Sequence, residues 1–281
     1  MAQDTVFYQK TRRIFEQRRA PMIMGILNIT PDSFSDGGKY TTEETWLKQA
    51  EKMISEGAEI IDIGGCSTRP GAEVVSPEEE LRRLIPAIQS VRKNFPEIII
   101  SADTYRAGTA KEAVKAGADM INDISGGTMD DEMFRTVAGL KVPYILMHIR
   151  GTPQTMQLDP VYNDVVSDVL SWINDRLTLL RNMGVRDVII DPGFGFGKTV
   201  KHNFQLLKNL GEFTKSGCPV MVGLSRKSMI NKILNINTKD SVTGTSVLNH
   251  IAVQNGASIL RVHDVKEAKQ VIMLENYLND L

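Results

Sequence analysis

The sequence has few cysteines and no long apolar run. Its two cysteines, Cys66 and Cys218, are isolated and belong to no CxxC pair, so neither a disulfide framework nor a zinc site is expected. The first residues lack the apolar core of a signal peptide, and no apolar stretch approaches the length of a membrane span. These absences predict a soluble protein of a reducing compartment, with the cytoplasm as its location.

An excess of charge of either sign is also missing. The 33 basic and 34 acidic residues give a formal net charge of −1, so binding to nucleic acid or membranes through bulk charge is not expected. With 42% hydrophobic and 24% charged residues, the composition is that of an ordinary globular protein. A chain of 281 residues fits one large barrel or two small domains.

The most informative stretch covers residues 188–199. Its first three residues are β-branched and predict a strand that is apolar on both faces, as in a buried parallel sheet. The strand ends on Asp191, and Pro192 and three glycines follow, so the backbone there can approach a ligand closely. The end of the stretch looks like a phosphate-binding P-loop, but Pro192 stands where that motif needs its first glycine.

Eight segments of the chain resemble this strand. They cover residues 22–27, 59–63, 98–102, 119–121, 143–147, 188–190, 219–222 and 258–260. Segments of helical character follow, over residues 42–56, 76–92, 106–116, 131–138, 161–182, 203–211, 245–255 and 265–278. Strands that alternate with helices predict a parallel sheet, and eight such units predict a (β/α)₈ TIM barrel. A doubly wound sheet would require two of the strands to be discarded.

We therefore predict an α/β protein with a single domain over residues 1–281. Residues 1–20 form an N-terminal arm or capping helix, and the barrel occupies about residues 21–281. In such a barrel the carboxyl ends of all strands open on one face, where active sites lie. The strands end on or near polar residues, namely Asn28, Asp103, Asn122, His148, Asp191, Lys227, Arg261 and His263. Any one of them alone could merely cap a helix or make a turn, but together they predict a site.

These residues divide into two chemical groups. Carboxylates, an amide and a cation suit a flat, nitrogen-rich heterocycle, because ionised carboxylates only accept hydrogen bonds. This group consists of Asp103, Asn122, Asp191 and Lys227, with Met147 and Phe196 either as apolar walls or as core residues. The second group suits an anion such as phosphate or diphosphate and consists of Asn28, Arg69, Arg261 and His263.

A resemblance to a known family rests on eight motifs. They lie at residues 25–38, 67–71, 103–106, 122–127, 147–153, 191–198, 225–228 and 261–264. Among them are Ser67-Thr68-Arg69-Pro70-Gly71 and Asp191-Pro192-Gly193-Phe194-Gly195-Phe196-Gly197-Lys198. In this order they make the chain resemble the dihydropteroate synthase family of folate biosynthesis over nearly its whole length. One departure is Cys66, which stands where many members of that family carry Glu.

The resemblance implies a transferase that joins p-aminobenzoate to 6-hydroxymethyl-7,8-dihydropterin diphosphate, with Mg²⁺ as cofactor. The products are 7,8-dihydropteroate and diphosphate, and the family is a sulfonamide target. It implies a cytoplasmic homodimer whose partners are these small molecules, with no nucleic acid and no membrane.

The resemblance also implies roles for individual residues. Asp103, Asn122, Met147, Asp191, Phe196 and Lys227 bind the pterin, and Asp103, Asp191 and Lys227 among them are catalytic. Asn28, Arg69, Arg261 and His263 bind the diphosphate, with Asn28 as the protein ligand to Mg²⁺. Thr68, Pro70 and Ser228 contact p-aminobenzoate.

Two alternatives are a pterin-binding methyltransferase barrel and a non-catalytic pterin-binding barrel. The first has no need of the motifs around Arg69 and His263, and the second predicts loss of site residues, which are all present. The aniline nitrogen of p-aminobenzoate needs positioning more than activation, and the sequence has no Ser-His-Asp or Cys-His nucleophile pattern. The long loops at residues 28–40 and 64–76 are expected to close over bound diphosphate and so order the binding of the substrates. His202 and His250 are expected to be structural.

Overall fold

The computed structural model describes residues 20–29, 43–66, 75–156, 158 and 160–281. Nearly all of the predicted N-terminal arm or capping helix and most of the loops at 28–40 and 64–76 lie outside these residues, and so do the site residues Thr68, Arg69 and Pro70. The ordered closure of the two loops therefore stays a prediction.

All eight predicted strands are present and form one parallel sheet. They are β1 (Met22–Asn28), β2 (Ile60–Gly64), β3 (Ile99–Asp103), β4 (Met120–Asp123), β5 (Tyr144–Met147), β6 (Val188–Asp191), β7 (Met221–Val222) and β8 (Ile259–Val262). Neighbours along the sheet follow the order β6-β5-β4-β3-β2-β1-β8-β7. A parallel bridge between Ile190 and Val220 joins the two ends of this order, so the sheet closes into the predicted (β/α)₈ barrel.

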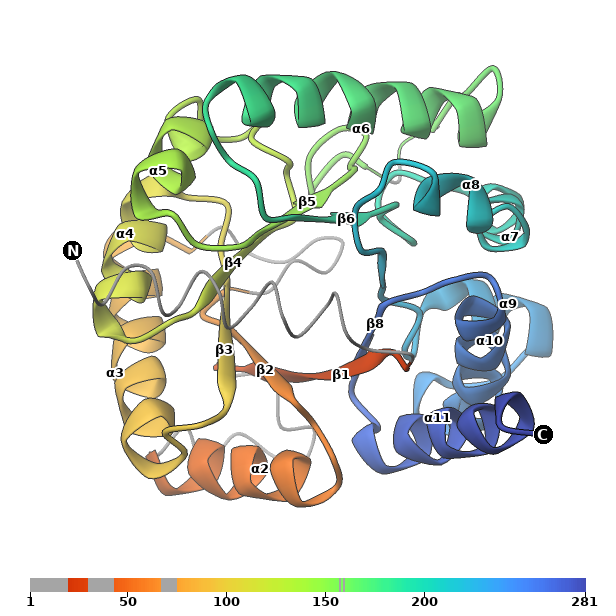
Figure 1. Ribbon diagram of the computed structural model, residues 1–281, viewed down its shortest axis with the longest axis horizontal. Coiled ribbons are helices and arrows are strands. Elements are labelled where there is room, and N and C mark those ends of the chain that lie inside the picture. The colour runs from red at the N-terminus through yellow and green to blue at the C-terminus, as the bar shows by residue number, and fades with distance from the viewer. Residues whose placement is uncertain (1–19, 30–42, 67–74, 157, 159) are drawn as a thin grey trace.

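Helices surround the strands on the outside, as Figure 1 shows. They are α2 (Glu43–Ser55), α3 (Pro77–Asn94), α4 (Ala107–Ala116), α5 (Met133–Leu140), α6 (Val165–Asn182), α7 (Val200–Lys208), α8 (Gly211–Thr214), α9 (Ser228–Leu234), α10 (Val242–Gln254) and α11 (Val265–Asn279). The helices α8 and α9 were not predicted, because runs this short carry little periodic signal. The described residues contain no helix that is long and apolar enough to cross a membrane.

Local sequence signals account for several helix ends. Ser76 accepts a hydrogen bond from the amide of Glu79 and so caps α3, with Pro77 as the first helical residue. The helix α4 ends at Gly117, whose φ of 117° lies in the left-handed region that favours glycine. At the start of α7, the Thr199 hydroxyl and the His202 ring form a reciprocal capping box, which confirms the structural role predicted for His202.

An apolar floor fills the lower part of the barrel. Alternate residues of each strand point inward, and at this level they are large and aliphatic. The floor consists of Met22, Met24, Ile60, Met120, Ile145, Ile189, Met221 and Ile259, all at most 2% exposed. A second apolar cluster lies between the strands and the helices. Two residues further along β2 and β4, the inward side chains become Asp62 and Asn122, so the polar site rests directly on this floor.

Candidate active site

The polar site is built around the guanidinium of Arg261 on β8. Its Nε lies 2.7 Å from Asp62 Oδ2, and its Nη2 lies 2.8 Å from Asp103 Oδ2. The amide of Asn122 donates to the same Asp62 oxygen at 3.0 Å. One cation therefore joins β2, β3 and β8 through hydrogen bonds, and β4 is tied in through Asp62.

Asp62 is the residue that the sequence prediction missed. Its side chain is completely buried, yet it interrupts an otherwise aliphatic strand, Ile60-Ile61-Asp62-Ile63. A carboxylate inside such a strand is costly unless it is paired, so this interruption was a usable signal. The prediction considered only residues at strand ends, and it grouped Arg261 with the anion-binding residues. The structure pairs Arg261 with two carboxylates, and its contact with an anion stays a prediction.

Two oxygens of this cluster have no hydrogen-bond partner among the described residues. They are Asp62 Oδ1 and Asn122 Oδ1, and both are buried. Buried acceptors normally find a partner, so each of these oxygens indicates a donor that a ligand or water supplies. Asn122 directs its NH₂ group toward Asp62, and its oxygen, like those of a carboxylate, can only accept. The floor of the site is therefore matched to a ligand with several N–H donors.

The other side of the site is formed by Asp191 and Lys227. Asp191 accepts a hydrogen bond of 2.7 Å from the amide of Gly193, while Lys227 Nζ donates to the carbonyl of Phe194. The Phe196 ring lies 4.7 Å from Lys227 Nζ and packs against a small apolar cluster that includes Met147. Predicted polar and apolar ligand residues thus lie side by side, as a flat ring requires.

Burial changes the ionisation of these groups. It raises the pKa of Asp191, an effect that the charge of Lys227 opposes. Burial likewise lowers the pKa of Lys227 to about 8, although Asp191 opposes that shift. Burial and the neighbouring charge of Asp62 raise the pKa of Asp103 to about 7. The site therefore holds acid and base groups whose pKa values lie near neutrality, which is typical of functional sites.

The predicted anion-binding residues Asn28 and His263 lie at the ends of β1 and β8. A Cβ at Gly64 would lie 3.4 Å from Asn28 Oδ1 and 3.5 Å from Asp103 Oδ2, so both oxygens lie beside this glycine. His263 Nδ1 lies 3.0 Å from the hydroxyl of Ser225. Within the described ranges, no group of three His, Cys, Asp or Glu side chains could hold a metal ion.

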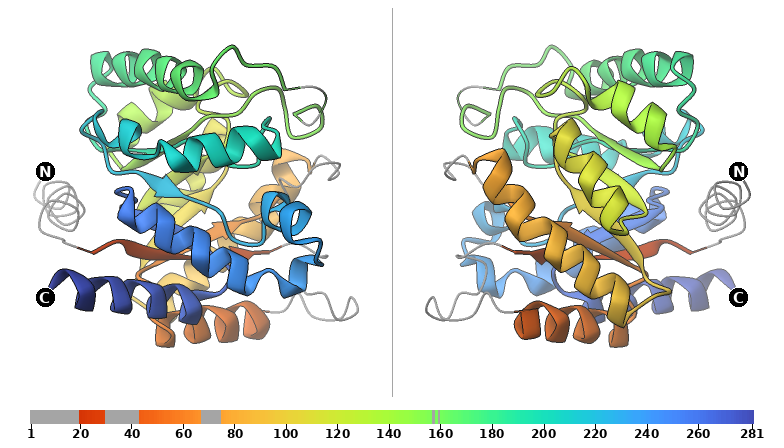
Figure 2. Two further views of the ribbon diagram at one scale, coloured as in Figure 1. Left: turned by 90° about the vertical axis from the view of Figure 1, so that its right-hand side faces the viewer. Right: turned by 90° about the vertical axis from the view of Figure 1, so that its left-hand side faces the viewer.

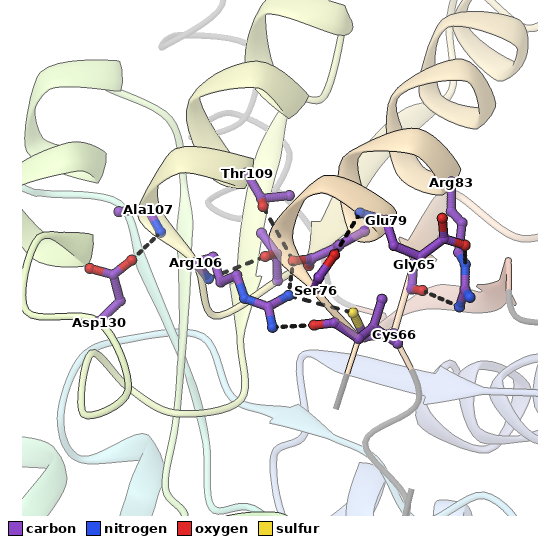
Figure 3. Close-up of polar contacts among 12 residues, drawn as sticks. Gly65, Cys66, Ser76, Glu79, Arg83, Arg106, Ala107, Thr109 and Asp130 are labelled. Carbon is purple, nitrogen blue, oxygen red and sulfur yellow. Dashed lines mark hydrogen bonds and ion pairs between the residues drawn. The ribbon is translucent and has the colours of Figure 1, made fainter. Parts of the chain in front are cut away.

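Arg106 fixes the two described ends of the loop that contains Arg69. Its guanidinium donates to the carbonyl of Val75 at 2.6 Å and approaches the sulfur of Cys66 at 3.8 Å. It also forms an ion pair of 2.5 Å with the buried carboxylate of Glu80. Figure 3 shows Arg106 beside Cys66. Burial and the charge of Glu80 raise the pKa of the Cys66 thiol to about 12, so Cys66 is not a nucleophile.

The ionisation of Asp103 gives a prediction about stability. Its pKa in the folded state lies above the unfolded value, so the neutral form stabilises the fold. This contribution is present below about pH 4 and is lost as the pH rises through about 7. Asp103→Asn mimics the neutral form and has no such pH dependence. We therefore expect the free energy of unfolding of wild type to fall by roughly 2 to 4 kcal/mol more than that of Asp103→Asn when the pH rises from 4 to 8.

Urea unfolding at both pH values measures this difference. Asp131→Asn, at an exposed position, is the matched control, and its free energy of unfolding should equal that of wild type at both pH values. A constant difference between Asp103→Asn and wild type across this range would contradict the assignment.

Comparison with known proteins places the chain among pterin enzymes. Residues 24–263 match the model of the family described as pterin binding enzyme. A dihydropteroate synthase of Synechocystis is 47% identical over 268 residues, which are 94% of this chain and 92% of the relative. The matched length therefore includes nearly the whole barrel.

Solved structures agree with this comparison. The crystal structure of Yersinia pestis dihydropteroate synthase with a sulfonamide drug complex has a TM-score of 0.89 at 40% identity, and covers 93% of this chain and 95% of that one. The enzyme from Xanthomonas albilineans in complex with 7,8-dihydropteroate has a TM-score of 0.85 at 37% identity, and covers 94% and 95%. The barrel, the buried hydrogen-bond acceptors above its floor and these relatives agree, and the chain belongs to the dihydropteroate synthase family of pterin-binding enzymes.

Proposed function

We propose that the chain condenses p-aminobenzoate with 6-hydroxymethyl-7,8-dihydropterin diphosphate, giving 7,8-dihydropteroate and diphosphate. The observation that carries the proposal is the pair of buried, unpartnered acceptors on Asp62 and Asn122 beside the carboxylates of Asp103 and Asp191. A pterin presents several N–H groups along one edge of a flat ring, which is the pattern these acceptors fit. The relative crystallised with 7,8-dihydropteroate supports the same assignment.

In this proposal each part of the site holds one part of the pterin substrate. Asn122 and Asp191 accept hydrogen bonds from the ring, and Lys227 offers a donor to a ring oxygen or nitrogen. Met147 and Phe196 belong to one apolar cluster and cover the ring from the side. Arg261 remains tied to Asp62 and Asp103, so the guanidinium forms part of the ring's surroundings and is held in place before the substrate arrives.

The diphosphate end lies toward Asn28 and His263, and toward Arg69, which is outside the described residues. Mg²⁺ prefers oxygen ligands and usually takes only one or two from the protein, with the rest from substrate phosphates and water. The oxygens of Asn28 and Asp103, which both face Gly64, fit this demand, and Asn28 would hold the ion. When bound, Mg²⁺ neutralises charge that develops on the leaving diphosphate.

The proposed reaction is a substitution at the methylene of the pterin. As the bond to diphosphate lengthens, positive charge develops on the methylene and spreads into the electron-rich ring. Asp103 and Asp191 lie fixed beside that ring and stabilise the charge electrostatically. The uncharged aniline nitrogen then needs only to be positioned, in the proposal by Thr68, Pro70 and Ser228. A sulfonamide resembles p-aminobenzoate, and the sulfonamide complex of a relative supports competition at this position.

Diphosphate release tests the proposed function directly. The protein is incubated with the pterin diphosphate and Mg²⁺, with and without p-aminobenzoate, while diphosphate and dihydropteroate are both quantified. We expect release that depends on p-aminobenzoate, with an equal amount of dihydropteroate formed. Tight pterin binding without any release would instead indicate a non-catalytic binding protein and overturn the proposal.

The role of Asp62 gives a second prediction. The substitution Asp62→Asn keeps the shape but removes the charge that holds Arg261 and Asn122. Since hydrogen bonds to charged groups contribute about 1.5 to 3 kcal/mol, we expect kcat/KM for the pterin diphosphate to fall about 10- to 100-fold. Steady-state kinetics measures the effect, and the exposed Glu44→Gln serves as the control. Unchanged kinetics in Asp62→Asn would contradict the role of the charge.

We also propose that the chain forms a homodimer through its last helices. Large apolar side chains are exposed on α9, α10 and α11, and α10 and α11 pack side by side (Figure 2). They are Ile233, Leu234, Val247, Met273, Leu274, Tyr277 and Leu278. An exposed apolar surface of this kind supports association with a second copy of the chain. The cytoplasmic location remains a prediction.

Size-exclusion chromatography coupled to light scattering measures the molar mass in solution and so the oligomeric state. Wild type is expected at twice the mass of one chain. The double substitution Leu274→Glu and Tyr277→Glu places two charges one turn apart on α11, so it should give the mass of one chain. The control Leu179→Glu changes an equally apolar exposed position on α6 and should stay dimeric. Wild type at the mass of one chain would exclude the proposed dimer.

A further inference from the structure

One motif of the sequence has no part in the site so far, namely the Gly197-Lys198-Thr199 run that resembles a P-loop. The Lys198 side chain is only 3% exposed and lies behind the loop between β6 and α7. Its Nζ lies 2.9 Å from the carbonyl oxygens of both Gly193 and Phe196, and 2.9 Å from Nδ1 of His148. These partners use all its hydrogen-bonding capacity, so Lys198 has nothing to offer a phosphate.

The bonds of Lys198 hold in either protonation state. Burial, together with the charge of Lys198, lowers the pKa of His148 to about 2, so the imidazole is neutral. Burial also lowers the pKa of Lys198, which the charge of Asp191 opposes. A charged lysine donates to all three partners, whereas a neutral one donates to the two carbonyls and accepts from the imidazole. The His148 ring is itself held edge-on against Trp172, with centroids 4.9 Å apart.

The loop that Lys198 holds is packed backbone against backbone. A side-chain carbon at Gly193 would lie 1.8 Å from the His148 carbonyl oxygen, and one at Gly197 would lie 2.4 Å from that of Arg150. Both glycines have positive φ, at 71° and 64°. A side chain at either glycine would therefore meet the backbone of the facing loop. The Gly193 carbonyl accepts from Lys198 and from the Phe196 amide, and the Gly197 carbonyl accepts from the Tyr162 hydroxyl at 2.8 Å.

The loop over residues 193–197 also contacts the residues proposed to bind the pterin. Its Phe194 carbonyl accepts from Lys227, and its Gly193 amide donates to Asp191. The Phe196 ring packs at the site, although the Phe196 carbonyl points back to Lys198. Three carbonyls of one short loop are therefore bound by two lysines, Phe194 by Lys227 and both Gly193 and Phe196 by Lys198.

We propose that Lys198 is a positioning residue for pterin recognition. It fixes the Gly193–Gly197 backbone, and through that backbone it fixes the Phe196 ring and the lysine and carboxylate that bind the pterin. The inference rests on the proposed function, since it concerns the same substrate. Without the Lys198 amine, the Phe196 carbonyl loses this donor and the Gly193 carbonyl keeps only the Phe196 amide, so the loop is expected to rearrange around Phe196.

The test compares Lys198→Met with wild type in steady-state kinetics for both substrates. Met keeps the apolar stem and removes the donors. We expect KM for the pterin diphosphate to rise at least about 10-fold, with kcat and the KM for p-aminobenzoate changed less than about 3-fold. Lys201→Met removes an exposed lysine in the first turn of α7, three residues away, and should behave as wild type. Tyr162→Phe, which frees the Gly197 carbonyl, should raise the pterin KM in the same direction by a smaller factor.

The pattern of constants separates positioning from mere stability. A lysine needed only for folding would lower the active fraction, so kcat would fall while both KM values stayed the same, and this result would overturn the proposal. If Lys198→Met does not fold, the single variants Lys198→Gln, which keeps a shorter donor, and Tyr162→Phe are measured instead. A wild-type KM for the pterin diphosphate in both variants would overturn the proposal. Failure of the proposed function is distinguishable, because wild type itself would then form no dihydropteroate.

Discussion

The site depends on one buried cation between carboxylates. Arg261 comes near the end of the chain, whereas Asp62 and Asp103 come from its first half, so this contact is made only when β8 lies beside the first strands. The arrangement would be unfavourable in isolation, because burying charges costs several kcal/mol for each ion. Here the carboxylates and the guanidinium satisfy one another, and the apolar floor beneath them keeps water from competing.

The unpaired oxygens follow from the same constraint. Asp62 directs one oxygen to Arg261 and Asn122, which leaves its second oxygen and that of Asn122 without donors among the described residues. Folding therefore leaves acceptors fixed in position but not satisfied, and a ligand that supplies donors recovers that free energy. A fixed set of acceptors also binds without rearrangement, which favours affinity for a rigid, flat ring.

Much of this was predictable from the sequence, and the misses have physical causes. Strand-helix alternation indicated the barrel, and strand-terminal residues such as Asp103, Asn122 and Asp191 indicated the end at which the site lies. The partner of Arg261 was not predictable from its type, because a guanidinium pairs equally well with phosphate and carboxylate. Asp62 interrupts an aliphatic strand, which was a usable signal, but its partners Arg261 and Asn122 come from distant strands and needed the fold. Lys198 was rejected as a phosphate ligand, but its backbone partners needed the folded loop.

The central claim is that the fixed acceptors above the apolar floor, on Asp62 and Asn122, bind the N–H groups along one edge of a pterin, independently of the diphosphate. Calorimetric titration with 6-hydroxymethyl-7,8-dihydropterin, without diphosphate or Mg²⁺, tests it most directly. The account predicts one pterin bound per wild-type chain and no measurable binding to Asn122→Leu, which keeps the volume but removes the acceptor. Equal affinity in the two proteins would contradict it, and would move recognition of the substrate to the diphosphate end.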